Sequence, residues 1–450
     1  MDIKKLIILA ICLTQSIFIN ARIWYVSQNG RGNKDGTSWS NAAADICDII
    51  KKDYSYPLYP LPGDEIWVSQ GTYSPIILWK GNDTIQYNPT RFRNTFRNKI
   101  RIYGGFSGYE NSLEERNKWN IYKTIISGDN KNYCIWIEDS SYLLHGEIGI
   151  IIDGFTLSNG HGQGSAIRLI HNNTLFNNIV ITGNSEAPLV YVENAKMDTA
   201  AEYYSKPIIV NTLIYNNQIN SDSQNHYSIF QTIYSDIEIL NTTIVNNFLS
   251  NNSYTLLAQN NSIIDVYNTI MYNNSHGRDH INNSRINYQS SLIQNILTNP
   301  LQMSGNNLGH NLDQYPSFVN ESNNDYRITL YGPCYLAGDL LLYGHIFQIF
   351  RTNPPIFFSY DIEGKNRFYN GRIDIGAYAC VIPNQNVSSN LSSFEDSADV
   401  DFVLVYDLNG KLFLSSPFSL FSTDTLEKNK YWIVVYYKDN KVVDIVKIFT

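Results

Sequence analysis

The chain has 450 residues, of which 43% are apolar, 16% are charged and 13% are aromatic, with 33 tyrosines. This composition argues against a coiled coil and against a disordered chain, and it suits a β-rich extracellular protein. The formal net charge of -8, without any local run of Lys and Arg, disfavours nucleic acid as a partner, because phosphate binding needs a concentrated basic face. The length favours two or three domains, or one elongated repeat domain.

The first residues predict a signal peptide over residues 1–21. A basic start at Lys4 and Lys5 is followed by an apolar run, Leu6–Leu13, and a small residue, Ala21, marks the expected cleavage site. The apolar run is too short to span a bilayer comfortably, and no other apolar stretch is long enough to do so. We therefore expect an exported protein with no stable membrane span.

A short capping helix is predicted before the first strands. Apolar side chains recur at helical spacing through residues 38–52, and Ser38 or Ser40 can cap the start. After this helix the chain contains short β runs, and because such short strands cannot form a domain singly, they must stack or pair. The clearest of these runs are Ile66–Val68, Ile100–Tyr103 and Thr124–Ile126.

An internal repeat occupies the middle of the chain. The segments 211–217, 241–247 and 268–274 share an Asn, a Thr, an apolar centre and a final Asn-Asn in the same register. Looser copies begin at Asn178 and Gly154, so successive copies start 24, 33, 30 and 27 residues apart. Each copy is a strand of about five residues ended by a turn, and two more short strands with loops must fill the rest of each interval.

This pattern predicts an all-β fold, a right-handed parallel β-helix (a solenoid), over residues 22–383. Stacked coils pair each strand with its equivalents above and below at about 4.8 Å, and loops that leave the stack explain the variable period. Asn at the turn can adopt the left-handed conformation, and we expect a structural ladder of stacked side chains through Asn216, Asn246 and Asn273. A leucine-rich repeat is disfavoured by the missing Leu frame, and a propeller would need roughly 40 or more residues per blade.

The end of the chain has a different character. Residues 384–400 are rich in Ser and Asn and have no apolar period, which indicates a linker. Residues 401–450 contain strand-like runs, the first two separated by Asn409-Gly410, a strong hairpin signal. We expect these runs to form a small C-terminal β-sandwich.

Several segments of the body resemble secreted bacterial proteins built from right-handed β-helix repeats. The resemblance covers about residues 23–380 and implies the same fold, although a fold does not settle an activity. It rests on opening segments, a "YGGF…E…R" segment, an "LDGFT" strand and a terminal "DIGAYE" strand, in which Ala379 replaces the usual acidic residue. In this sequence they are Tyr25–Trp39, Gly63–Tyr73, Tyr103–Phe106 with Glu110 and Arg116, Ile152–Thr156, and Asp374–Tyr378.

Residues 402–450 resemble the C-terminal sorting domain of type IX secretion. Val405–Lys411 is the most recognisable stretch, and Tyr431–Val435 and Val442–Ile448 match the last two strands. Asn429-Lys430 stands where the family usually has Gly. The resemblance implies recognition by the type IX secretion machinery in the outer membrane, removal of the tail and a Bacteroidota-type host.

No catalytic set of a polysaccharide-degrading β-helix enzyme is complete in this sequence. Gly160-His161-Gly162 matches one element of polygalacturonases, but their Asn-Thr-Asp, Asp-Asp and Arg-x-Lys elements are missing. We therefore interpret these residues as a tight turn that exposes His161. No phosphate loop, nucleophile elbow or zinc motif is present, so the sequence predicts no catalytic residue, no metal ligand and no cofactor.

The acidic residues of the early coils do not recur at one strand position. A calcium-assisted lyase needs such residues on one face, together with a basic residue. We therefore interpret them as solvated loop charges: Asp129, Glu138, Asp139, Glu147 and Asp153.

Four cysteines follow the predicted signal peptide, and their wide spacing fits no zinc-ligand pattern. They are Cys47, Cys134, Cys334 and Cys380. An exported protein can pair cysteines, and Cys334 with Cys380 is the favoured pair because both lie at the end of the same domain. Free buried thiols are an equally open alternative.

Two classes of function remain open. The first is a non-catalytic surface or secreted protein that binds glycans or host material, with Tyr215 and Tyr272 as a flat platform for sugar rings. The same tyrosines can instead serve only in packing. The second is a polysaccharide lyase or glycoside hydrolase with an unrecognised site. Acids are scarce on the predicted strands between residues 178 and 274, which favours binding over catalysis.

Overall fold

The computed structural model describes most of the chain. The residues left out are 1–20, 51, 53–57, 79–99, 117–122, 139–148, 163, 187, 195–205, 222–224, 300–302, 344–359, 366, 368–371, 381–401, 408–411, 418–425, 429, 439–440 and 450.

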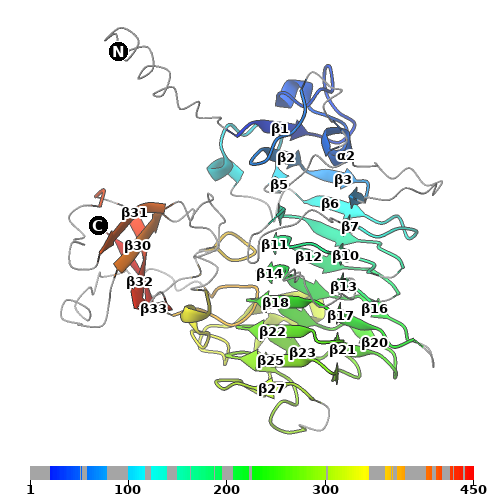
Figure 1. Cartoon of the computed structure of the whole chain (residues 1–450), viewed down its shortest axis with the longest axis vertical. Helices are drawn as coiled ribbons and strands as arrows, with labels where there is room; N and C mark the ends of the chain where they lie inside the picture. The colour runs from blue at the N-terminus through cyan, green and yellow to red at the C-terminus, as the bar shows by residue number, and fades with distance from the viewer. Residues whose placement is uncertain are drawn as a thin grey trace, which may run out of the picture.

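The body of the chain consists of three all-parallel sheets, and successive coils add one strand to each sheet (Figure 1). The ten-stranded sheet contains, in pairing order, β1 (Ile23–Val26), β2 (Glu65–Ser69), β5 (Arg101–Phe106), β8 (Ile151–Asp153), β11 (Leu175–Asn177), β14 (Ile208–Val210), β18 (Asp236–Leu240), β22 (Ile263–Tyr267), β25 (Arg285–Gln289) and β27 (Asn306–Asn307). The eight-stranded sheet contains β3 (Gly71–Tyr73), β6 (Thr124–Ser127), β9 (Thr156–Ser158), β12 (Val180–Thr182), β15 (Leu213–Tyr215), β19 (Thr243–Val245), β23 (Ile270–Tyr272) and β26 (Leu292–Ile293).

The seven-stranded sheet completes the coils. It contains β4 (Ile76–Leu78), β7 (Ile135–Glu138), β10 (Ile167–Ile170), β13 (Val190–Glu193), β17 (Ser228–Ile233), β21 (Tyr254–Gln259) and β24 (Asp279–Asn282). A short parallel pair, β16 (Gln218–Ile219) with β20 (Phe248–Leu249), extends two coils. The predicted all-β fold, a parallel β-helix, is confirmed.

The internal repeat sets the register of the coils. Ile214 pairs with Ile244, and Ile244 pairs with Met271, so the three repeat copies lie in adjacent turns of the eight-stranded sheet. The looser copies at β9 and β12 continue the same sheet. The sequence repeat therefore corresponds to one coil of the solenoid.

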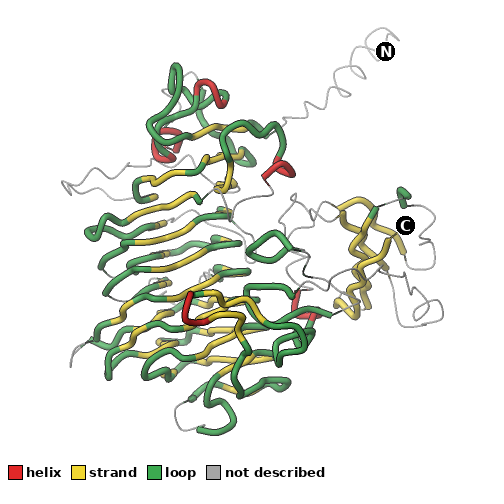
Figure 2. Tube along the Cα trace, turned by 180° about the vertical axis from the view of Figure 1, so that it is seen from behind, coloured by secondary structure: helices red, strands yellow, loops and turns green. Residues whose placement is uncertain are grey.

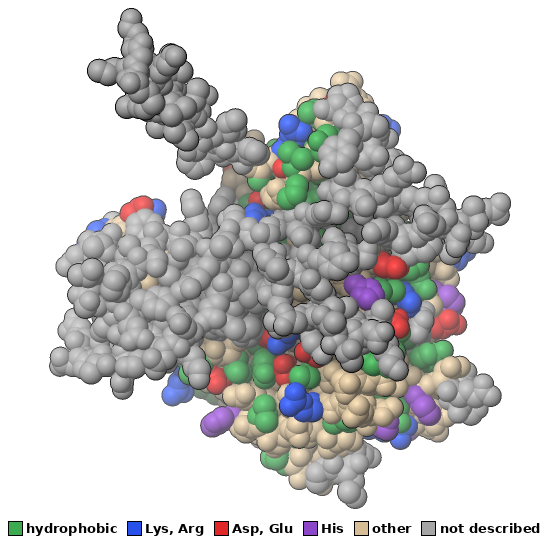
Figure 3. Space-filling view, in the orientation of Figure 1, with side chains coloured by type: hydrophobic (Ala, Val, Ile, Leu, Met, Phe, Trp, Pro, Cys, Tyr) green, Lys and Arg blue, Asp and Glu red, His purple; other side chains and the backbone are tan. Residues whose placement is uncertain are grey.

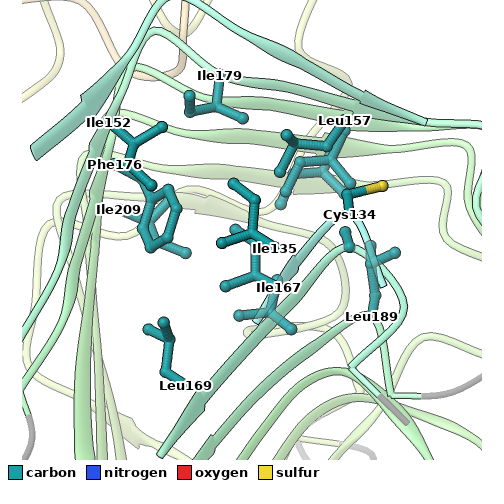
Figure 4. Close-up of a cluster of buried hydrophobic side chains, with 14 of the residues drawn as sticks. Cys134, Ile135, Ile152, Leu157, Ile167, Leu169, Phe176, Ile179, Leu189 and Ile209 are labelled. Carbon is teal, nitrogen blue, oxygen red and sulfur yellow. The ribbon is translucent and has the colours of Figure 1, made fainter. Parts of the chain in front are cut away.

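The core fills the space between the three sheets (Figure 4). Ile135 and Ile167 point inward from the seven-stranded sheet, Ile152 and Phe176 from the ten-stranded sheet, and Leu157 from the eight-stranded sheet. All five side chains are buried. Each such side chain contributes roughly 1.5–3 kcal/mol when it leaves water, so the stack is stabilised mainly by this inner column.

The N-terminal cap differs from the prediction of one helix over residues 38–52. The structure has a 3-10 helix η1 (Trp39–Asn41) and a short α-helix α2 (Ile46–Ile50). Between them, the backbone N–H of Ala43 donates to the carbonyl of Tyr25 at 2.9 Å, which extends the pairing of β1. A continuous helix cannot form because these residues are used as a β-bridge.

A closing segment, which comprises the described residues between 312 and 380, covers the outer face of the eight-stranded sheet. Its elements include an antiparallel strand pair that is visible from behind in Figure 2. Leu213, Val245 and Ile270 point outward from the coils and form a second buried cluster with Tyr326 and Ile375 of this segment. The elements are β28 (Phe318–Asn320), η4 (Glu321–Asn323), β29 (Asp325–Ile328) and η5 (Leu340–Tyr343).

The asparagines expected to form the ladder occupy the turn itself. Asn216, Asn246 and Asn273 have positive φ values of 52°, 51° and 51°, so the predicted left-handed conformation is present. Asn216 and Asn273 are exposed and Asn246 is half-buried. Asn273 donates to Asn246 at 2.6 Å, whereas Asn246 donates to the hydroxyl of Tyr326. These three residues do not form a continuous buried ladder.

The buried ladder runs through the next residue of each copy. The Nδ2 atoms of Asn184, Asn217 and Asn247 donate to the Oδ1 atom one coil further on, at 2.9, 2.9 and 2.8 Å, and the last acceptor is Asn274. All four side chains are buried. The prediction was displaced by one residue, because the turn residue points to solvent while its successor points under the turn.

The tail forms one four-stranded antiparallel sheet, in the order β31-β30-β32-β33. A two-sheet sandwich was expected, but the four described strands all pair edge to edge and leave none for a second sheet. The predicted linker, residues 384–400, lies outside the described residues, and so does the predicted hairpin turn at Asn409-Gly410. Of the predicted signal peptide, residues 1–20 also lie outside the described residues, and Ala21 is exposed. The strands are β30 (Phe402–Asp407), β31 (Leu412–Pro417), β32 (Tyr431–Lys438) and β33 (Lys441–Phe449).

The described cysteines form no disulfide with one another, which agrees with the free-thiol alternative. Cys134, Cys334 and Cys380 are free thiols, so the favoured pair, Cys334 with Cys380, is not formed. The thiol of Cys47 donates a hydrogen bond to the carbonyl of Pro75 at 3.4 Å. Burial raises the pKa of the Cys134 thiol to about 12, so this thiol stays protonated and behaves as a small core residue.

Candidate functional site

The Gly160-His161-Gly162 motif forms a turn, as expected. Gly162 and Gly164 have φ values of 92° and 84°, a conformation that favours glycine. His161 is partly exposed, and its Nε2 atom lies 3.1 Å from the Glu186 carboxylate. His161 is thus a turn residue with a surface ion-pair partner.

Asp153 is not the solvated loop charge that we expected. It is fully buried on β8, and its carboxylate contacts Arg116 at 2.5 Å, at the end of the 3-10 helix η2 (Leu113–Arg116). Asn177 donates to the same carboxylate at 2.7 Å. This network holds η2 against the coils, so its role is structural. Asp129 is exposed as expected, and the two acids outside the described residues are Asp139 and Glu147.

The predicted tyrosine platform is not an open surface. Tyr215 lies with its ring 5.4 Å from the ring of Tyr326, and Tyr272 lies 5.7 Å from Tyr315. Both pack against the cluster beneath the closing segment. The alternative that these tyrosines serve in packing is therefore correct, and a sugar platform must be sought on another face.

The outer face of the seven-stranded sheet carries such a surface. Strand register places Trp136, Arg168, Tyr191 and Gln231 in one row on four successive coils. A second row, two residues further along each strand, contains Glu138, Ile170, Glu193 and Ile233. Both rows run parallel to the solenoid axis. We call this surface the aromatic–carboxylate strip, and it comprises Tyr133, Trp136, Glu138, Arg168, Tyr191, Glu193 and Gln231.

Arg168 lies at the centre of the strip among three aromatic rings. Its guanidinium carbon is 4.8 Å from the ring centroid of Tyr191, 5.6 Å from that of Trp136 and 5.9 Å from that of Tyr133. Cation–π contacts of this kind fix the direction of a long side chain. Trp136, Tyr133 and Arg168 are half-buried, whereas Tyr191 is buried and serves as a support. In the view of Figure 3, acidic, basic, histidine and hydrophobic side chains lie close together on the visible face of the coils.

The two carboxylates of the strip have different surroundings. Burial raises the pKa of Glu138; Arg168 opposes this rise and the negative charge of Glu193 adds to it. Glu193 accepts a hydrogen bond from the hydroxyl of Tyr191 at 2.8 Å. Burial also lowers the pKa of the neighbouring His171, so the imidazole tends to be neutral. The strip therefore offers one carboxyl that is protonated easily and one that is held as a hydrogen-bond acceptor.

Gln231 ends the first row of the strip. Its amide Nε2 donates to Gln259 at 3.0 Å, but its Oε1 atom is buried and has no hydrogen-bond partner among the described residues, and the residue is only 8% exposed. A buried acceptor without a partner costs about 1–3 kcal/mol. A hydroxyl group of a bound molecule can remove that cost.

A second charged cluster lies on the outer face of the ten-stranded sheet. Lys206 Nζ is 3.6 Å from Glu238 on β18 and 3.6 Å from Asp265 on β22, and Asp236 lies beside them. Burial alone lowers the pKa of Lys206, but these carboxylates outweigh it and the pKa is raised. A lysine that stays protonated cannot act as a general base. The expectation that strands between residues 178 and 274 hold almost no acids is wrong for β13, β18 and β22.

Sequence reasoning missed the strip because it followed the Asn repeat, which belongs to a different sheet. A signal was available in the sequence. Ile135–Glu138 and Val190–Glu193 share the pattern aliphatic, aromatic, aliphatic, Glu, and the intervening strand Ile167–Ile170 has the same alternation with Arg168 at the aromatic position. Only the register of β7, β10 and β13 brings these side chains together.

No group of three or more His, Cys, Asp and Glu side chains suited to a metal ion is found among the described residues. No protein-family model matches the chain, and no curated protein matches it. A solved structure, the crystal structure of pectate lyase Pel9A, shares 12% sequence identity and has a TM-score of 0.28; the match covers 80% of this chain and 97% of that chain. The assignment of the fold rests on the strand pairing described above.

Proposed function

We propose that the protein is an exported β-helix protein, secreted or on the cell surface, that binds polysaccharide through the aromatic–carboxylate strip. One observation carries the proposal: the half-buried ring of Trp136, a fixed guanidinium and two carboxylates lie in rows along successive coils, with the buried ring of Tyr191 as a support. Aromatic faces pack on sugar rings, and charged side chains bind hydroxyl groups. Binding by itself requires none of the chemistry of a lyase or hydrolase.

Binding is tested with immobilised polysaccharides and a variant of the half-buried ring of Trp136. Trp136→Ala should weaken binding about 10-fold, which corresponds to about 1.4 kcal/mol. Tyr331→Ala is the matched control, because Tyr331 is 81% exposed and lies in the closing segment. If both variants bind as tightly as the wild type, the strip is not the binding surface.

The alternative function, a polysaccharide lyase or glycoside hydrolase, is favoured by a different observation. Glu138 and Glu193 lie in the same row, two coils apart; burial raises the pKa of Glu138, whereas Glu193 accepts a hydrogen bond from Tyr191. Unequal carboxylates of this kind are typical of glycoside hydrolases. The raised pKa of Lys206 disfavours a lyase in which that lysine is the base.

Export through the type IX secretion machinery is the second part of the proposal. The signal peptide and the resemblance of residues 402–450 to sorting domains support it, together with the separate antiparallel sheet of the tail. In the described part of the chain, no helix combines the length and hydropathy needed to cross a membrane. Deleting residues 402–450 should leave the body folded and retained in the periplasm, with the signal peptide still cleaved. Surface labelling of cells measures this, and normal labelling of the truncated protein would exclude the tail as the export signal.

A further inference from the structure

We propose that the strip also hydrolyses the polysaccharide it binds, with Glu138 as general acid and Glu193 as general base, and with inversion at the anomeric carbon. This inference rests on the proposed function, since the substrate must first lie along the strip. The substrate class is a neutral, linear polysaccharide.

The positions of the two carboxylates carry the inference. Glu138 on β7 and Glu193 on β13 are aligned with the same residue of β10, Ile170, which lies between them. Parallel strands are about 4.8 Å apart, so the two backbone positions are about 9.6 Å apart. Inverting glycoside hydrolases hold their carboxyl groups about 6.5–9.5 Å apart, which leaves room for a water molecule beside the sugar. The flexible stems of two glutamates cover this range.

The surroundings of the two residues assign their roles. Glu138 is desolvated beside β10, which favours the protonated form that a general acid needs. Glu193 is fixed by the hydroxyl of Tyr191, so its carboxylate keeps one direction and remains an acceptor for a water proton. Tyr191 is a positioning residue, because it is buried and acts through Glu193 and Arg168.

The buried acceptor of Gln231 is an independent sign of a ligand. Its Oε1 atom has no hydrogen-bond partner in the part of the chain that the structure describes, and the residue ends the row that begins at Trp136. A sugar hydroxyl at this point satisfies that oxygen, while Trp136 supports a sugar ring three coils away. The ligand therefore extends along the axis, which requires a linear chain.

The charge of the strip selects the class of polysaccharide. Among the described residues of the strip, two carboxylates face one guanidinium, so these residues carry no net positive charge even when Glu138 is protonated, whereas a polyanion needs an excess of cations. A neutral polysaccharide does not need an excess of cations, so we infer that it is the substrate class.

The reaction balances without a cofactor. The carboxylic acid of Glu138 gives its proton to the glycosidic oxygen as the bond from that oxygen to the anomeric carbon breaks. A water molecule attacks the opposite side of the anomeric carbon, and its proton passes to the Glu193 carboxylate. Exchange of one proton with solvent restores both residues.

The experiment uses the full chain with soluble glucan, mannan and xylan, and with polygalacturonate as the anionic comparator. New reducing ends should form on a neutral polysaccharide that the protein binds, and the first product should have inverted anomeric configuration by NMR. Glu138→Gln and Glu193→Gln should each lower the rate about 100-fold or more while they retain binding. Glu186→Gln is the control, because Glu186 lies in a turn outside the strip and pairs with His161.

Each outcome is decisive. Binding without new reducing ends overturns the hydrolysis and leaves the proposed binding function intact, whereas binding to none of the polysaccharides overturns both. Retained configuration, or full activity in either glutamine variant, overturns the assigned roles. If either glutamine variant fails to fold, Glu193→Asp keeps a carboxylate set back by one methylene and should be slow but not inactive.

Discussion

At the scale of single residues, adjacent asparagines of the repeat have separate tasks. Asn246 supplies the left-handed turn at a φ of 51°, where a residue with a bulky side chain is strained. Asn247 lies beneath it with less than a tenth of its surface exposed, and it bonds to the coils on both sides. The two adjacent asparagines therefore have different roles: one provides the turn conformation, and the other provides the buried hydrogen bonds.

This division gives a prediction for Asn247→Leu. The substitution removes the amide that accepts from the backbone N–H and the Nδ2 atom of Asn217 and that donates to Asn274 and to the carbonyl of Ile214, so several buried hydrogen bonds are lost together. The free energy of unfolding should fall by about 3 kcal/mol, near the upper end of the cost of unsatisfied buried groups. Asn246→Gly is the control, because Gly keeps the turn conformation, and it should change stability by less than about 1 kcal/mol. Equal effects in chemical denaturation would mean that the ladder contributes nothing.

At the scale of elements, the charges between β18 and β22 make stability depend on pH. Burial raises the pKa of Asp236 to about 6 from the ordinary value of 3.8, and Asp265 adds to the rise while Lys206 and Arg285 oppose it. In this range the folded protein retains a proton that the unfolded chain has released. Asp236 therefore stabilises the fold below about pH 4, and this contribution is lost as the pH rises through 6.

Asp236→Asn should remove that dependence. The neutral amide keeps an oxygen for the backbone N–H of Ile263, which now donates to Asp236 at 2.9 Å. Above pH 6 the variant should be more stable than the wild type by up to about 3 kcal/mol, the equivalent of the pKa difference, and this difference between the two proteins should grow between pH 4 and 6. Denaturation curves at several pH values measure this, and parallel profiles for the two proteins would contradict it.

Much of the element structure was predictable and some was not. The strands beginning near Ile66, Ile100 and Thr124 and the coil register follow from short apolar runs and the Asn repeat, which are local signals. The interruption of the predicted helix at Ala43 was not predictable, because it depends on pairing with β1. The strip was missed for the same reason: Glu138 and Glu193 meet only when strands 55 residues apart are placed in register.

At the scale of the whole molecule, one core extends through the stack from Trp24 to Met303. We therefore predict that the coils unfold in one cooperative transition. Ile244→Ala removes a fully buried side chain that is stacked between Ile214 and Met271, and it should lower the free energy of unfolding by about 2–5 kcal/mol. Amide hydrogen exchange should then accelerate equally near both ends of the stack. Acceleration confined to the neighbouring coils would show that the solenoid unfolds in pieces.

The asparagine ladder gives the solenoid a direction of assembly. Each amide donates to the coil that follows it in the chain, from Asn184 to Asn274, so each finished coil presents a donor and an open strand edge to the residues synthesised next. The partners lie only 27 to 33 residues apart, and closing loops of that length costs little entropy. A chain that emerges from a narrow pore with its N-terminus first can therefore add one coil at a time, and each coil is the template for the next.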